Sequence, residues 1–577
     1  MCLIIGLPWL GALIVWLVGD GHPRLQHALA TAFSVGGGIA ALALLPFTSF
    51  EPALRLSMGG VFGDFTLVPD GLGVFLAAVA AVIGCLAVIF STDYMHGEAQ
   101  LGRYYAFVLL FIGAMAGLVL TGSLLILFIF WEITALCSYA LIAFHNDDPK
   151  AVAGGIKALI VTGLGGVGLL AGALIAFAYL GSYDINTFLA EAGSLPALAL
   201  SVIAFGFLAG AAAKSAQVPF QTWLPDAMEA PTPVSALIHA ATMVNAGVYL
   251  LARFYPAFEA VPGWTTTVLV VGLLSSLLAA IMALVSTDLK RTLAYSTISQ
   301  LGYMVAAIGA GAVFASQFHL LSHAVFKALL FLGAGAVIHA VGTRDMRQMG
   351  GLGPQMPFVR AVFVIGAWAL AGLPIANGFF SKELVLEGAL GHAPAWAYWG
   401  MVIGAGLTAF YTLRMVSMVF YGEPRGATHA HDAPAAMRVS LAVLAAGTLV
   451  SWLLVGLFDD FLGGSLPFHE IEAVTTPGVI GEVFTAPATY LALAVIAAGL
   501  LLALLRGPLV GLGRALGPLA RFADVGLGFE HLNRGLINLT TGTASALRGA
   551  QTGVISWNMV GILGGLVILL AILVRGA

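Results

Sequence analysis

Residues 124–144 read LLILFIFWEITALCSYALIAF, a continuous apolar stretch with one carboxylate, Glu132, near its middle. A helix of this length rises about 30 Å, which matches the hydrocarbon thickness of a bilayer. A charge at that depth costs about 2.5 kcal/mol or more, so it is rarely kept there without a use. The stretch therefore predicts a transmembrane helix that carries a functional residue.

The composition of the whole chain extends this prediction. Of 577 residues, 60% are hydrophobic and only 9% are charged, whereas a soluble domain carries about 25% charged residues. No water-soluble fold could hide so much apolar surface, so we expect an all-α polytopic membrane protein embedded in the lipid bilayer. The net charge of −4 indicates no particular partner, and we expect no nucleic acid among the partners.

About sixteen apolar segments are long enough to cross a bilayer. They are 3–19, 29–48, 70–91, 104–121, 122–144, 158–180, 197–228, 232–254, 265–286, 292–311, 313–341, 358–390, 397–420, 437–458, 486–505 and 556–574. Lys and Arg concentrate in the loops after odd-numbered segments, so the positive-inside rule places those loops in the cytoplasm and the N-terminus outside. The first segment lacks a basic start and a cleavage site, so we expect it to be retained.

Two of these segments are predicted to be broken helices. Pro219 interrupts 197–228, and Pro374, flanked by glycines, interrupts 358–390. Each break frees backbone groups that must line a cavity or meet another helix. The two breaks lie five spans apart, a pattern that points to inverted five-helix repeats.

This reasoning divides the chain into six parts. They are N-terminal transmembrane helices (1–103), a first repeat of spans 4–8 (104–254), a second repeat of spans 9–13 (265–420), additional transmembrane helices (437–505), an amphipathic connection on the cytoplasmic side (506–555) and a last transmembrane helix (556–577).

The first half holds three ionisable residues within apolar helices: Glu132, Lys214 and His239. Burial favours an opposite charge nearby, so we expect Lys214 to pair with Glu132. A buried lysine can exchange its proton near neutral pH, and a carboxylate that moves closer or away would switch it. His239 could relay protons as a neutral imidazole. The alternatives are a structural ion pair and a packed polar histidine.

The second half holds a row on one helix face: His319, His323 and Lys327 follow each other at intervals of four. We interpret the row as part of a proton relay. Zinc is the rival, but no H-E-x-x-H motif and no acidic third ligand are present, so we expect no metal. Lys382, just after the second break, is interpreted as the terminal site of the path, and the alternative is a snorkelling interfacial anchor.

Other charged residues receive structural interpretations. Lys290, Arg291 and Arg344 are expected to be solvated loop charges, and Asp226 and Glu229 to cap helix ends. Walker A motifs and cysteine clusters are absent from the sequence. We therefore expect no cofactor bound by this chain; quinone, flavin and Fe–S centres would belong to partner subunits if the complex is redox-driven.

Three stretches carry a family resemblance. LPDAMEAPTPVSALIHAATMVNAGVYLLAR (224–253), STDLKRTLAYSTISQLGYM (286–304) and FHLLSHAVFKALLFLGAGAVIHA (318–340) closely resemble the antiporter-like subunits of respiratory complex I and the Mrp antiporters. Within that family the chain is most similar to subunit L (chain 5) and to the N-terminal part of the Mrp A subunit.

The resemblance implies a fourteen-helix inverted-repeat core. It also implies roles for seven residues: a Glu132–Lys214 pair, His239 linking towards Lys327 with His319 and His323 beside it, and Lys382 as the terminal site. Other membrane subunits of a complex I-like or Mrp-like assembly are the implied partners.

The chain departs from the family pattern at three places. Subunit L usually has Arg and Asp where this chain has Gly163 and Gly166, and Mrp subunits usually have lysine where it has Asn245. The long lateral helix of subunit L does not fit 506–555, which glycines and Pro508 interrupt.

We therefore expect a prokaryotic inner-membrane or plasma-membrane subunit that translocates protons, or exchanges Na⁺ for protons, within a larger complex. Two alternatives remain open: a coupling subunit of an inorganic-carbon uptake system, and a scaffold that does not conduct.

Overall fold

The computed structural model describes residues 1–425, 430–471, 473–505, 518, 522 and 527–550. The chain forms two units, Met1–Phe529 and Glu530–Ala577. The first half of the first unit contains α1 (Cys2–Val18), α2 (Pro23–Leu44), β1 (Leu54–Ser57), β2 (Asp64–Leu67), α3 (Gly71–Tyr94), α4 (Leu101–Leu120), α5 (Leu124–Ile142), α6 (Pro149–Leu180), α7 (Ile185–Glu191), α8 (Ala197–Lys214), α9 (Trp223–Asp226), α10 (Thr232–Ala236), η4 (Leu237–Ala241) and α11 (Met243–Phe258).

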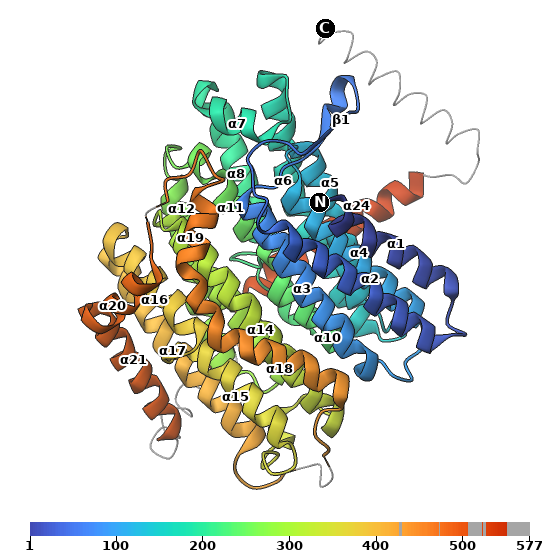
Figure 1. The fold of residues 1–577 in the computed structure, drawn as a ribbon, viewed down its shortest axis with the longest axis vertical. Helices are drawn as coiled ribbons and strands as arrows, with labels where there is room; N and C mark the ends of the chain where they lie inside the picture. The colour runs from blue at the N-terminus through green and yellow to red at the C-terminus, as the bar shows by residue number, and fades with distance from the viewer. Residues whose placement is uncertain (426–429, 472, 506–517, 519–521, 523–526, 551–577) are drawn as a thin grey trace. The chain divides into compact units, whose positions relative to one another are not determined.

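The helices continue through the second half of that unit (Figure 1). They are α12 (Trp264–Val285), α13 (Leu289–Gly309), α14 (Val313–Val341), α15 (Pro357–Ala371), α16 (Asn377–His392), α17 (Ala395–Phe420), α18 (Ala435–Val450), α19 (Val455–Gly463), α20 (Thr476–Thr485) and α21 (Pro487–Leu504). The helix α24 (Phe529–Ala550) covers part of the segment 506–555 that is predicted to be amphipathic, and most of the rest of that segment lies outside the described residues. Its cytoplasmic placement stays a prediction.

The helices confirm a polytopic membrane protein. Twelve helical segments in the described part of the chain are long and apolar enough to cross a membrane, and two shorter helices, α1 and α15, are also apolar. Each predicted span up to 486–505 coincides with one helix or, where the span is broken, with successive helices, whereas 556–574 lies outside the described residues. The total of sixteen spans, the repeats and the six-part division stay predictions.

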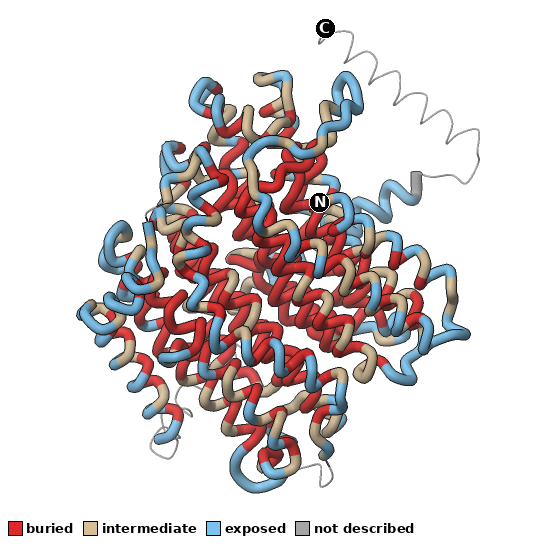
Figure 2. The backbone as a smooth tube through the Cα atoms, viewed as in Figure 1, coloured by how far each residue is buried: buried red, intermediate tan, exposed pale blue. Residues whose placement is uncertain are grey.

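Burial follows the pattern expected in lipid. Large apolar side chains such as Leu17 and Leu198 are 69% and 78% exposed, because lipid tails are as apolar as leucine and leave no reason to hide them. Buried residues run along the inner helices (Figure 2). The helix α14 lies at the centre of this packing, against α3, α10, α13, α15, α16 and α18. The row of ionisable residues on α14 is therefore enclosed by helices.

Both predicted helix breaks are present. The helix α8 ends at Lys214, and irregular backbone through Pro219 separates it from the short α9. The helix α15 ends at Ala371, where Gly372 adopts a φ of 76° as its C-cap, and α16 begins at Asn377. Lys214 is the last residue of α8, and Lys382 of α16 reaches Leu370 O at the end of α15, where the last carbonyl groups lack intrahelical partners.

A third break lies within the predicted span 232–254, at residues 237–242, which contain neither proline nor glycine. Residues Leu237–Ala241 form a π-helical turn, and Thr242 leaves the helix at φ −129° and ψ −107°. Side chains satisfy the freed carbonyls: Thr242 Oγ1 donates to Leu237 O at 2.8 Å and Asn245 Nδ2 donates to Ala240 O at 2.7 Å. π-bulges are frequent at functional sites, and His239 lies inside this one.

The prediction of an all-α chain misses one small element. The strands β1 and β2 pair antiparallel, with Leu54 opposite Leu67 and Ser57 opposite Asp64. The hairpin lies between α2 and α3, outside every predicted span. Its loop, with Gly59, Gly60 and Gly63 at positive φ, uses the freedom of glycine to turn the chain.

The position of α8 depends on a close crossing with α6. A Cβ built on Gly206 would lie 2.7 Å from the carbonyl oxygen of Gly168, well inside van der Waals contact. Glycine at both positions lets the two backbones touch, as small residues do in membrane helix pairs.

We expect Gly206→Val to push α8 away from α6 and to destabilise the chain by about 1–3 kcal/mol through overpacking. Heat-induced unfolding of the purified chain in detergent measures the change. Gly193→Val is the matched control, because nothing lies within 4 Å of a Cβ there. Equal changes in the two variants would contradict the crossing.

A loop histidine ties the chain between α19 and α20 to α11. His469 Nε2 donates to Ala252 O at 2.9 Å, and its Nδ1 is buried without a partner. Burial lowers the pKa of His469 to about 4 from 6.5. The unfolded chain therefore binds more protons than the folded chain between these values, and stability falls as pH falls through that window.

We expect the wild-type chain to lose about 1 kcal/mol between pH 7.5 and pH 5 on account of His469, a figure reduced for its partial exposure. His469→Gln, which can still donate to Ala252 O, should remove that part of the pH dependence. Unfolding midpoints of both chains at the two pH values test this, with His145→Gln, an exposed histidine, as control. An unchanged pH profile in His469→Gln would refute the assignment.

Candidate functional site

Lysine burial marks the site. The chain has six lysines, and all except Lys150 are at most 5% exposed. A buried ammonium needs hydrogen-bond acceptors to offset its lost hydration. The buried lysines are Lys157, Lys214, Lys290, Lys327 and Lys382.

Lys214 is held by the helix that carries Glu132. Its ammonium donates to the carbonyl oxygen of Trp131 at 2.6 Å and lies over the Trp131 ring, 4.7 Å from the ring centroid. The acceptor is therefore the peptide group next to Glu132. Carbonyl and aromatic face both stabilise a cation without carrying a charge themselves.

Glu132 does not form the predicted ion pair with Lys214. No ion pair joins these two described residues, although their charges interact electrostatically at longer range. The carboxylate instead lies against α6: Oε1 has no hydrogen-bond partner, and a Cβ at Gly166 would overlap it. The carboxylate of Glu132 thus occupies the space that the missing side chain of Gly166 leaves on α6.

His239 lies in the π-helical turn, fully buried. Its ring stacks on Phe331 of α14, with centroids 5.0 Å apart and planes at 20°. Neither ring nitrogen has a hydrogen-bond partner among the described protein groups. A buried imidazole in this state leaves a donor and an acceptor free for a water molecule.

Short backbone and side-chain contacts connect Lys214 to His239. Ser215, next in sequence to Lys214, donates from Oγ to Val244 O at 2.7 Å. The neighbouring Asn245 donates to Ala240 O, which adjoins His239. The end of α8 and the π-helical turn are therefore coupled through the start of α11.

The predicted row on α14 faces α13 and α16. Lys327 donates to Leu293 O at 3.3 Å and makes a short hydrogen bond to Ser296 Oγ. His323 has both ring nitrogens buried without partners, and it interacts electrostatically with Lys327, His319 and His239. The row thus extends towards His239 on one side and towards α16 on the other.

His319 connects the row to Lys382. Its Nε2 lies 3.2 Å from Gln300 Oε1 and its Nδ1 lies 2.9 Å from Ser381 Oγ, on the residue before Lys382. An amide oxygen only accepts, so Nε2 donates to Gln300, and Nδ1 is left to accept from Ser381. Ser381 Oγ also lies 3.0 Å from Asn377 O, so the single hydroxyl proton of Ser381 has two acceptors, His319 Nδ1 and Asn377 O.

Lys382 ends the row at the second helix break. Its ammonium donates to Leu370 O in the last turn of α15 at 2.9 Å and lies 5.8 Å from the Tyr303 ring centroid. The adjacent Glu383 accepts from Thr489 Oγ1 of α21 at 2.5 Å. The additional helix α21 therefore contacts Glu383, the residue next to the terminal lysine Lys382.

Buried polar atoms without protein partners follow the same helices. They are found on side chains of α5, the α8–α9 connection, η4, α11, α13, α14 and α16. Examples are Ser138, Gln217, Gln221, Asn245, Gln300, Gln317, Ser322 and Asn377. Buried polar groups are normally paired with protein or with ordered water, so these atoms retain unused hydrogen-bonding capacity.

The expected loop charges are wrong in part. Lys290 is only 4% exposed and donates to Ala230 O at 2.6 Å. Arg344 pairs with Glu229 at 2.5 Å and with Asp288 at 2.7 Å. Asp226, expected to cap a helix, instead pairs with a lysine of α6 and an arginine of α13, namely Lys157 at 2.8 Å and Arg291 at 3.7 Å.

These charges form a network around α9 and the short helix η3 (Ala227–Glu229) that follows it. The network joins this segment to the start of α13 and to the loop that follows α14. The acidic residues lie in the 224–253 and 286–304 stretches. Sequence reasoning missed the network because its members are far apart along the chain and each looks like a loop charge when taken alone.

A buried ion pair was also missed. Arg253 of α11 makes a short ion pair to Asp70, the N-cap of α3, and both side chains are at most 5% exposed. The sequence offered a signal for the N-cap role of Asp70, because an aspartate just before an apolar run is a common N-cap pattern.

Comparison with known proteins places the chain in a family. Residues 121–408 match the family described as NADH:quinone oxidoreductase/Mrp antiporter, TM, and residues 56–105 match NADH-Ubiquinone oxidoreductase (complex I), chain 5 N-terminus. NADH-quinone oxidoreductase subunit L of Pseudomonas aeruginosa is 40% identical over 82% of this chain and 81% of its own length.

Antiporter proteins match as well. Na(+)/H(+) antiporter subunit A1 of Staphylococcus saprophyticus is 38% identical over 71% of this chain. A chain of the Mrp complex from Dietzia sp. DQ12-45-1b superposes with a TM-score of 0.82 and 31% identity, over 100% of this chain. The match spans 54% of the antiporter subunit and 63% of the Mrp chain. This chain belongs to the family of multi-pass membrane subunits shared by NADH:quinone oxidoreductases and Mrp antiporters.

Proposed function

We propose that the chain translocates protons, or exchanges Na⁺ for protons, as a membrane subunit of a larger complex I-like, hydrogenase-type or Mrp-type assembly. The observation that carries the proposal is the buried row from Lys214 through His239, Lys327 and His319 to Lys382. Each member lies at or beside a helix break, or on a helix packed against one. A scaffold would not need charges in these places, since each costs free energy in the bilayer.

The proposed mechanism begins at Lys214. Burial favours the neutral form of a lysine, and a nearby carboxylate favours the charged form. Glu132 is only half-buried and rests against glycines rather than in an ion pair. Its movement towards or away from Lys214 would load or unload the lysine, and water at the orphaned polar groups would carry the proton to His239 and onwards.

The relatives support two candidate parent complexes, a redox-driven one and a secondary antiporter. Purifying the native complex in mild detergent and identifying its subunits by mass spectrometry separates them. Subunits with Fe–S centres and a quinone site would make this chain part of a redox pump. Small Mrp-type membrane subunits alone would make it part of an antiporter, and a zinc-enzyme partner would favour inorganic-carbon uptake.

We expect Glu132→Gln and Lys214→Ala to lower proton translocation by the assembled complex at least tenfold, because each removes one half of the proposed switch. Quenching of a pH-sensitive dye in inverted membrane vesicles measures translocation, and native gels verify assembly. Glu98→Gln and Lys150→Gln, exposed residues of the same types, are the matched controls. Normal translocation in both assembled mutants would refute the proposal and leave the scaffold.

A further inference from the structure

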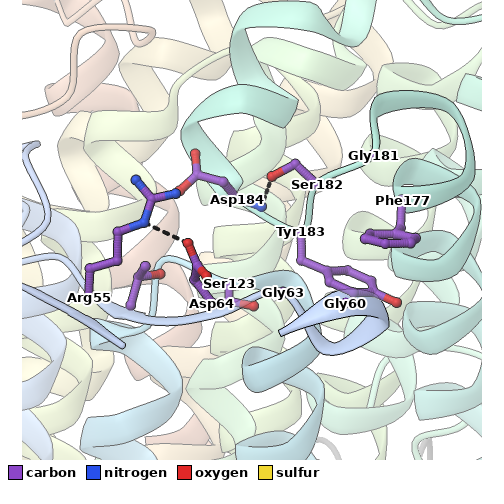
Figure 3. A pocket seen from close by; sticks show the side chains of 11 residues that line it. Arg55, Gly60, Gly63, Asp64, Ser123, Phe177, Gly181, Ser182, Tyr183 and Asp184 are labelled. Atoms are coloured by element: carbon purple, nitrogen blue, oxygen red, sulfur yellow. Dashed lines mark hydrogen bonds and ion pairs between the residues drawn. The ribbon is translucent and has the colours of Figure 1, made fainter. Parts of the chain in front are cut away.

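A polar pocket lies away from the buried row, between the β1–β2 hairpin and the start of α7. Figure 3 shows the side chains that line it, and its volume is about 220 Å³. That volume is below the roughly 300–1,000 Å³ of typical drug-sized ligand sites, and a water molecule takes up about 30 Å³. The pocket therefore has room for one small polar group, such as a headgroup, or for a cluster of waters.

Charges of both signs line the pocket. Arg55 Nε donates to Asp64 Oδ2 at 2.6 Å, and the guanidinium also interacts electrostatically with Asp184. The hydrogen bond from Arg55 lowers the pKa of Asp64, which stays ionised. One guanidinium thus faces two carboxylates, so the charged side chains that line the described pocket sum to one negative charge.

Two hydroxyls in the pocket wall have no partner. Thr66 and Ser123 are each 2% exposed, both line the pocket, and neither side-chain oxygen makes a hydrogen bond to any described residue. Buried hydroxyls are normally paired, and each orphan costs about 1–3 kcal/mol. Such groups can donate to an anionic oxygen, so the pocket offers donors for an anion beside carboxylates for a cation.

The surroundings place the pocket at the bilayer surface. Two candidate spans, α5 and α6, end beside it at Leu124 and Leu180. Four apolar residues of the hairpin and one tyrosine of α6 are 41–60% exposed: Leu56, Met58, Val61, Phe62 and Tyr179. Exposed apolar and tyrosine side chains at the end of a span are typical of the headgroup boundary.

We propose that this pocket binds the headgroup of an amine-bearing phospholipid, of the phosphatidylethanolamine type. The ammonium would lie against Asp184 and Asp64, and the phosphate would accept from Arg55 and from the hydroxyls of Ser123 and Thr66. The acyl chains would run along the exposed hairpin and α6. A purely anionic lipid would leave the excess carboxylate unbalanced.

Native mass spectrometry of the full chain, titrated with phosphatidylethanolamine or phosphatidylglycerol of identical acyl chains, tests the proposal. We expect phosphatidylethanolamine to bind at least tenfold more tightly. Asp184→Asn should abolish that preference while preserving the helix start, because asparagine also caps helices and Asp184 caps α7. Ser123→Ala should weaken binding of both lipids about threefold to tenfold.

Glu191→Gln, an exposed residue of α7 outside the pocket, is the matched control and should bind both lipids like the wild type. Soluble glycerophosphoethanolamine separates the sources of the headgroup, since it lacks acyl chains. Competition by it at the affinity of the lipid would identify a soluble ligand and overturn the lipid assignment. Equal binding of the two lipids by the wild type, or a retained preference in Asp184→Asn, would overturn the site itself.

Discussion

A buried ammonium needs oxygen atoms, and a regular helix has few to spare. In this chain four buried lysines take theirs from peptide carbonyls of other segments: Lys214 from Trp131, Lys290 from Ala230, Lys327 from Leu293 and Lys382 from Leu370. Each bond joins two elements that are separate in sequence. Lys214 is the last residue of α8 and Lys382 lies in the second turn of α16, so each proline-associated break has a buried lysine beside it that reaches such a carbonyl. The packing of the bundle thus supplies acceptors for charge in an apolar interior.

The sequence predicted helix positions well because hydrophobic length is nearly the only requirement that a bilayer imposes. The sequence also located both proline-associated breaks, because proline removes a backbone hydrogen-bond donor wherever it occurs. The break at Leu237–Ala241 escaped prediction because side chains, Thr242 and Asn245, satisfy its carbonyls. This replacement of backbone donors by side-chain donors depends on three-dimensional geometry, so the local amino-acid composition does not predict it.

The residues of the candidate site were predictable as a set, because an ionisable residue in a long apolar run stands out. Their partners were not. Opposite charge suggested Glu132 for Lys214, yet the lysine reaches the neighbouring carbonyl, and Glu132 rests in the space above Gly166. From the sequence alone, a charge is paired with an opposite charge. In the folded chain peptide carbonyl groups are also acceptors, and every residue has one, so the residue types do not show which carbonyl is used. The network of Asp226, Glu229, Asp288 and their basic partners was missed for another reason, because its members lie far apart along the chain.

The carbonyl partners have a consequence for how a lysine here could change charge. An ammonium and a neutral amine both carry N–H groups, so either form can donate to the same peptide oxygen. When a proton leaves Lys382, the bond to Leu370 O can persist, and no carboxylate is stranded inside the bundle. An ion pair such as Arg253–Asp70 has no such freedom, since neutralising one partner would leave the other charged and unpaired. The described part of the chain thus contains an arginine that a carboxylate holds in its charged state and a lysine that can lose its proton and keep the same hydrogen-bond partner.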